Sequence, residues 1–162
     1  KKLVYNQNGG MQIPMWDKVK ETVLYLKSKG YRVDGIGWQG HLMNNQGLKQ
    51  FVENLDEELK KLSDLIDWAH SNNLEFHITE LDYYNDGENN ILNSVEKQAE
   101  VYQKLMNVSQ EKSKNGLVTV NFWSMGERKS SRGKKGHYMS IYDNDTIPTK
   151  TYEVVKKFIN FN

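Results

Sequence analysis

The 162 residues of this chain are enough for one domain with a substantial hydrophobic core. The net charge is +1 with 27% charged residues, so there is no electrostatic case for binding nucleic acid or an anionic membrane. The chain has no cysteine, which excludes disulfides and thiolate metal sites, and no apolar run approaches the ~20 residues of a membrane-spanning helix.

Short apolar runs alternate with longer segments of helical periodicity along the whole chain. The predicted strands are residues 3–5, 33–38, 74–81 and 117–123. The predicted helices run from Pro14 to about Lys29, from about Asn54 to Ser71, from about Ser94 to Lys114, and onward from Pro148. This alternation predicts an α/β fold, a parallel sheet with outer helices. The sheet is either a small open one or half of a (β/α)8 TIM barrel, since a whole barrel takes ~250 residues.

The longer predicted loops, at 7–14, 42–53, 83–93 and 124–148, follow strands rather than helices. In parallel barrels the active site lies at the carboxyl ends of the strands, so the polar and aromatic residues there are candidates for function. Carboxylates, amides, imidazole and indole are the groups with which a sugar pocket performs acid–base chemistry, binds hydroxyls and stacks on rings. These candidates are Asn6, Gln39, His41, Glu80, Asp82 and Trp123.

Four segments carry a specific resemblance to a known family. They read DGIGWQGHL (34–42), ITELD (78–82), VNFWSMGE (120–127) and SIYDNDTIPTKTY (140–152). In order and spacing they resemble the C-terminal half of family 10 glycoside hydrolases, endo-β-1,4-xylanases built on a (β/α)8 barrel, and the opening LVYN resembles that family's fifth strand. The resemblance implies that residues 1–162 supply strands five to eight of the catalytic barrel, and that the N-terminal half is absent from this chain.

The resemblance also implies roles for individual residues, and it implies no metal and no cofactor. Glu80 corresponds to the catalytic nucleophile at the end of the seventh strand, and His41 to the histidine that hydrogen-bonds it. Gln39, Trp123 and Asn6 correspond to residues that line the substrate pocket. A hydrogen-bond donor beside the nucleophile is physically reasonable, because it favours the ionised form that must attack the sugar.

One essential group has no counterpart here. Retaining glycosidases need a second carboxyl ~5 Å from the nucleophile. The resemblance places this acid/base on the fourth strand, outside these residues, and neither Asp82 nor Glu127 replaces it. We expect Asp82 to lie on the opposite side of the strand or beyond its end, in a supporting role. We therefore expect a partner that pairs with the open sheet edges: the N-terminal half of the same barrel or a second copy of this half.

The expected substrate is xylan or a xylo-oligosaccharide, hydrolysed by the assembled barrel, with the chain alone inactive. A polymeric substrate implies a secreted, periplasmic or cell-surface enzyme. No signal peptide is visible, but the chain opens directly on the strand-like KKLVYN, so we do not expect Lys1 to be the native start. Two other functions stay open: a non-catalytic sugar-binding or structural half-barrel, and a related β-glucanase.

Several further residues have structural interpretations. Trp38 is expected to pack in the core or against a loop, whereas Tyr83 and Tyr84 either line the cleft or pack beneath it. The basic segment RKSSRGKK (128–135) reads as a solvated loop rather than an anion site, because it also carries Ser and Gly. The remaining histidines show no metal-ligand spacing: His70, His77 and His137.

Overall fold

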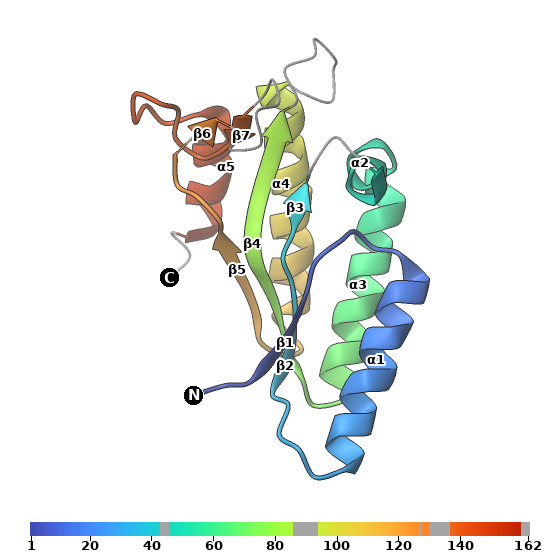
Figure 1. Ribbon diagram of the computed structural model, residues 1–162. Coiled ribbons are helices and arrows are strands. Elements are labelled where there is room, and N and C mark those ends of the chain that lie inside the picture. Colours follow the sequence, from blue (N-terminus) through green and yellow to red (C-terminus); the bar gives the residue numbers. More distant parts are fainter. Residues whose placement is uncertain (43–45, 86–93, 127, 130–136, 160–162) are drawn as a thin grey trace.

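The computed structural model describes residues 1–42, 46–85, 94–126, 128–129 and 137–159 (Figure 1). Within these ranges no helix is both long enough and apolar enough to cross a membrane. The elements in chain order are β1 (Val4–Gln7), α1 (Ile13–Ser28), β2 (Gly35–Trp38), β3 (His41–Leu42), α2 (Gln46–Glu53), α3 (Leu55–Ser71), β4 (Glu75–Asn85), α4 (Val95–Lys112), β5 (Val118–Phe122), β6 (Arg128–Lys129), β7 (His137–Met139) and α5 (Lys150–Ile159).

The strands β1, β2, β4 and β5 lie side by side in that order, and all of them are parallel. The helices α1, α3 and α4 provide the crossovers between them, and Figure 1 shows these helices flanking the strands. Asn6 of β1 pairs with Gly37 of β2, and Gly37 pairs in turn with His77 of β4. This repeated strand-helix arrangement confirms the predicted α/β fold with outer helices.

The strand β4 extends four residues beyond its predicted end at Leu81, and this extension belongs to a second small sheet. There it pairs in parallel with β3 and antiparallel with β7, which pairs with β6. The segments 42–53 and 124–148 were expected to be loops, and that expectation is wrong where they form α2, β6 and β7. These elements are two to eight residues long, too short to show a sustained hydrophobic period.

The two faces of the parallel sheet differ in chemistry. Phe76 and Ile78 of β4 are fully buried in the core cluster with residues of the helices. The alternate residues of β4, His77 and Thr79, lie on the other face, which we call the inner face. Gly37 lies between strands on this face, where an added Cβ would stand 3.0 Å from a Thr79 methyl carbon. The sheet is therefore apolar toward its helices and polar on its inner face.

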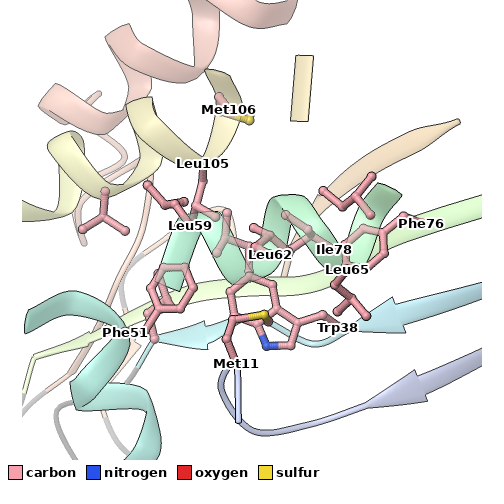
Figure 2. Packing of buried hydrophobic residues seen from close by; sticks show 14 of the residues in the cluster. Met11, Trp38, Phe51, Leu59, Leu62, Leu65, Phe76, Ile78, Leu105 and Met106 are labelled. Carbon is pink, nitrogen blue, oxygen red and sulfur yellow. The ribbon is translucent and has the colours of Figure 1, made fainter. Parts of the chain in front are cut away.

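Trp38 lies in the core, which is one of the two placements expected for it (Figure 2). Its indole Nε1 donates to the Gly9 carbonyl at 2.7 Å, which satisfies its one polar atom. Phe51 of α2 is also fully buried, with its ring centroid 5.2 Å from that of Trp38. The unpredicted helix α2 thus covers one end of the core with Phe51.

The longer helices agree with prediction to within two residues at each predicted boundary, for identifiable reasons. The helix α1 begins at Ile13, with Pro14 in its first turn, and ends shortly before Gly30, whose φ of +79° suits a residue without a side chain. The helix α3 carries three acidic residues in its first turn, where negative charge interacts favourably with the positive end of the helix dipole. At α4 the Ser94 hydroxyl accepts the Lys97 amide at 3.0 Å and caps the helix.

Candidate active site

The carboxyl ends of β1, β2 and β4 meet at one edge of the sheet through a chain of backbone hydrogen bonds. The Gln39 amide donates to the Gln7 carbonyl at 2.9 Å, and the Glu80 amide donates to the Gln39 carbonyl at 2.9 Å. These bonds bring Asn6, Gln39 and Glu80 into one region although 74 residues separate the first from the last. The predicted grouping of strand-end residues is therefore present in the structure.

An irregularity in β4 sets the direction of Glu80. Ile78 pairs with Val120 of β5, but the next pair is Leu81 with Phe122, so β4 carries one extra residue at this point. Asn121 opposes the irregular stretch, and its Nδ2 donates to the Ile78 carbonyl at 3.5 Å. Such bulges redirect side chains, because they interrupt the strict alternation of a strand.

Glu80 has one hydrogen-bond donor near each carboxylate oxygen. His41 Nε2 lies 3.2 Å from Glu80 Oε2, and Asn6 Nδ2 donates to Glu80 Oε1 at 3.5 Å. The Glu80 side chain retains 20% exposure, so it is held in place and still open to a ligand. A carboxylate oriented by donors on both oxygens is suited to nucleophilic attack, because its plane is fixed before the ligand arrives.

His41 bridges two carboxylates. Its Nδ1 lies 2.8 Å from Asp82 Oδ1, on the side of the ring opposite Glu80. Burial is the largest single influence on the pKa of His41 and lowers it. The hydrogen bond and charge of Asp82, followed by the charge and hydrogen bond of Glu80, outweigh burial and leave the pKa raised above its ordinary value. The ring is therefore biased toward the doubly protonated form, which donates to both carboxylates.

The position of Asp82 corrects one of its two expected placements, the one beyond the strand end. Asp82 is not beyond the end of the strand, because β4 continues to Asn85, and it is 2% exposed. It pairs directly with His41 of β3, a strand that the sequence did not reveal. A signal that could have indicated β3 is Gly40, whose φ of +77° turns the chain from β2 into β3. The supporting role expected of Asp82 thus takes a definite form, since this carboxylate holds His41 against Glu80.

Aromatic groups divide between the site and the core. Trp123 follows β5, is 49% exposed, and meets the His41 ring edge-on with centroids 5.8 Å apart. An exposed indole next to His41, which itself contacts Glu80, is suited to stacking on a sugar ring. Tyr83 and Tyr84 are 2% and 6% exposed, so they pack in the interior instead of lining a cleft. Burial raises the pKa of Tyr83 above its ordinary range, as expected of a phenol held neutral.

The other predicted residues contribute less to the site. Gln39 is half-buried and takes part through the two backbone bonds given above. His77 Nδ1 lies 2.8 Å from the Thr119 hydroxyl on the inner face. In the described part of the chain, no three His, Asp or Glu side chains are grouped to hold a metal ion. Glu127, residues 130–135 and the side chain of His137 lie outside what the structure describes.

Four adjacent parallel strands with outer helices and a carboxylate site at the strands' carboxyl ends are the arrangement of part of a β/α barrel. Residues 1–158 match the family model described as Glycosyl hydrolase family 10. The chain belongs to glycosyl hydrolase family 10.

A relative supports the family, a solved structure supports the fold, and the coverages show that the chain spans about half or less of each of these proteins. The chain is 32% identical over 126 residues, 76% of its length, to Endo-1,4-beta-xylanase A of Thermoanaerobacterium saccharolyticum, and spans 9% of that protein. It is 27% identical over 172 residues to the Beta-1,4-xylanase of Dictyoglomus thermophilum, covering 97% of this chain and 45% of that protein. The solved Thermobacillus composti GH10 xylanase superposes with a TM-score of 0.75 at 22% identity, covering 97% of this chain and 52% of that one.

Proposed function

We propose that this chain supplies one side of the active site of a retaining β-1,4-xylan hydrolase, with Glu80 as the nucleophile. The observation that carries the proposal is the geometry around Glu80. Its two oxygens lie 3.2 Å from His41 Nε2 and 3.5 Å from Asn6 Nδ2, and its side chain stays 20% exposed at the carboxyl ends of the strands. Membership of the family and the two relatives named as xylanases support the substrate class.

The chemistry assigns each group a task. Glu80 attacks the anomeric carbon and forms a glycosyl ester, while the bond to the leaving oxygen breaks and an acid protonates that oxygen. Water then hydrolyses the ester and returns its proton to the group that acted as the acid. His41 and Asn6 orient the attacking carboxylate, Asp82 holds His41, and Trp123 offers a stacking surface for a xylose ring.

The acid does not come from Asp82. Its side chain is 2% exposed and its Oδ1 is engaged by His41 at 2.8 Å, so it does not reach a leaving-group oxygen. Retaining enzymes place the two carboxyls ~5 Å apart on either side of the cleaved bond. We propose that the acid/base is contributed by the N-terminal half of the same barrel, which this chain does not contain.

The flanks of the chain support such a partner. Among the described strands, β1 pairs only with β2 and β5 only with β4 in the parallel sheet, so each has an open edge. Met125 and Ile159 line an apolar hollow between the end of β5 and α5, and they are 56% and 69% exposed. Open edges with exposed apolar side chains favour pairing with more chain. We also propose that the assembled enzyme works outside the cell, because xylan is a polymer.

Reconstitution tests the proposal. The chain is mixed with a complementary half that contains the fourth strand, and release of reducing ends from xylan and from mixed-linkage β-glucan is measured. We expect the chain alone to be inactive, the mixture to hydrolyse xylan in preference to glucan, and Glu80→Gln to lower the activity at least about a thousandfold.

The matched control is Glu75→Gln. Glu75 lies on the same strand with the same 20% side-chain exposure, but it pairs with Lys2 at 2.8 Å, away from the site. Activity of the Glu80→Gln mixture equal to that of the Glu75→Gln mixture would contradict the nucleophile assignment. Xylan binding by a stable mixture that hydrolyses nothing would favour the alternative of a sugar-binding module, and preferred hydrolysis of glucan would favour a β-glucanase.

A further inference from the structure

Thr79 precedes the proposed nucleophile and has no task in the chemistry above, yet its hydroxyl is placed for one. Thr79 Oγ1 donates to Asn6 Oδ1 at 2.9 Å, and a second acceptor, the Trp38 carbonyl, lies farther away at 3.4 Å. A hydroxyl has a single proton, so the shorter contact with Asn6 is the principal hydrogen bond. Asn6 is in turn the residue that donates to Glu80 Oε1.

The contact spans an entire strand. Asn6 is on β1 and Thr79 on β4, and β2 runs between them. Neighbouring strands lie ~4.8 Å apart, so side chains two strands apart meet only if the strand between them presents no side chain. Gly37 fulfils this condition, because a Cβ there would stand 2.7 Å from Asn6 Oδ1 and 3.0 Å from Thr79 Cγ2.

The bulge in β4 allows both Thr79 and Glu80 to contact Asn6. In a regular strand Thr79 and Glu80 would point to opposite faces, and one amide would not reach both. Because β4 carries an extra residue between Ile78 and Leu81, both side chains contact Asn6. Asn6 therefore stands between an anchor and the carboxylate that it orients.

The direction of each bond is fixed by chemistry. An ionised carboxylate only accepts hydrogen bonds, so Asn6 must present Nδ2 to Glu80. This leaves Asn6 Oδ1 facing Thr79, whose hydroxyl donates to it. A bond received at the amide oxygen polarises the amide and strengthens the bond that its nitrogen donates. At 3.5 Å the contact of Asn6 with Glu80 is long, so it depends on the amide being held in place.

We propose that Thr79 is a positioning residue for the hydrolysis: its hydroxyl anchors the Asn6 amide across Gly37, and the anchored amide fixes the plane of the Glu80 carboxylate. This inference rests on the proposed function, in which Glu80 attacks the sugar. The anchoring itself is a property of the chain alone and is measurable without catalysis.

The test uses Thr79→Val, which removes the hydroxyl and keeps the shape, and Thr79→Ser, which keeps the hydroxyl. The matched control is Thr119→Val, which removes an inner-face hydroxyl that contacts His77 and not Asn6. In the chain alone, the side-chain amide protons of Asn6 are followed by NMR as pH is lowered through the ionisation of nearby carboxylates. We expect Thr79→Val to reduce the shift of these signals by at least about half, and Thr79→Ser and Thr119→Val to retain it.

In the reconstituted enzyme we expect kcat/KM on xylan to fall about threefold to tenfold for Thr79→Val, the range that one modest hydrogen bond supplies, and to recover with Thr79→Ser. Should Thr79→Val fail to fold, Thr79→Ala replaces it in both measurements. The proposal is overturned if the Asn6 signals of a folded variant lacking the hydroxyl respond as in the unchanged chain, or if Thr119→Val has an equal effect. If the unchanged chain and the complementary half form an inactive mixture, the proposed function is contradicted. The NMR comparison of Thr79→Val with the unchanged chain then still decides whether Thr79 anchors Asn6.

Discussion

Replacing Asp82 by asparagine tests the link between the buried carboxylate and His41. The substitution keeps the size of the side chain and an acceptor oxygen 2.8 Å from His41 Nδ1, but it removes the charge at a position that is 2% exposed. A hydrogen bond involving a charged group contributes ~1.5–3 kcal/mol and a neutral one ~0.5–1.5 kcal/mol, so the expected loss is about 1–1.5 kcal/mol. For a domain of this size that corresponds to a fall in Tm of about 2–6 °C.

The stability lost in Asp82→Asn should depend on pH and should be larger at low pH. Burial lowers the pKa of His41, but Asp82 and then Glu80 raise it beyond that effect, so the folded-state pKa exceeds the unfolded one. A group of this kind contributes stability that is fully present below its unfolded pKa of about 6.5 and is lost as pH rises through the folded pKa. Asp82→Asn removes the main influence that raises the pKa of His41. The substitution should therefore destabilise the chain more at about pH 5.5 than at about pH 8.5.

Urea unfolding followed by tryptophan fluorescence at both pH values measures the change in stability. An NMR titration of the His41 ring checks whether Asp82→Asn lowers the pKa of His41. The control is Asp64→Asn, since Asp64 is 61% exposed and its pair with Lys60 at 2.7 Å lies on the surface of α3. The control should change stability by less than about 0.5 kcal/mol at either pH. A destabilisation by Asp82→Asn that is equal at both pH values, or no greater than the control, would refute the reasoning.

Three further substitutions probe the fold and the pocket. Gly37→Ala should destabilise by about 1–3 kcal/mol in urea unfolding, because its Cβ would lie 2.7 Å from a side-chain oxygen of the neighbouring strand, whereas Gly126→Ala, with nothing within 4 Å, should be nearly neutral. Phe51→Ala should cost about 3–5 kcal/mol, since this ring is fully buried, and Leu24→Ala, at a side chain 45% exposed, should cost far less; equal losses would contradict the role of α2 in the core. Trp123→Ala should leave the Tm within about 2 °C. In a reconstituted barrel made inactive by Glu80→Gln, it should weaken xylohexaose binding about tenfold by calorimetry, and unchanged affinity would exclude the stacking role.

The regular part of the fold was predictable because its elements carry sustained patterns. The stripe from Leu55 to Ala69 identifies α3, and the apolar run ending at Trp123 identifies β5. The eight-residue helix α2 was missed, because the burial of Phe51 against Trp38, which stabilises it, is a tertiary effect. The strand β3 was missed for a related reason, since two residues form it only by pairing with the far half of β4.

The candidate site was also predictable only in part. The residue types at the strand ends were visible in the sequence, and the resemblance to the family joined His41 to Glu80. The bulge that lets Thr79 and Glu80 share Asn6 has no sequence signature, because it depends on the register between β4 and β5. Of the two positions expected for Asp82, the one beyond the strand was wrong, because the strand was expected to end at Leu81, whereas pairing with β3 and β7 extends it to Asn85.

The most direct test of the account is to identify the residue that forms the covalent intermediate. The chain, alone and mixed with the complementary half, is treated with an activated 2-fluoro xylobioside that traps the glycosyl-enzyme, and the labelled peptide is sequenced by mass spectrometry. The account predicts a stoichiometric label on Glu80 in the mixture and none in the chain alone. A label on another carboxylate, or an unlabelled Glu80 in a mixture that hydrolyses xylan, would contradict it.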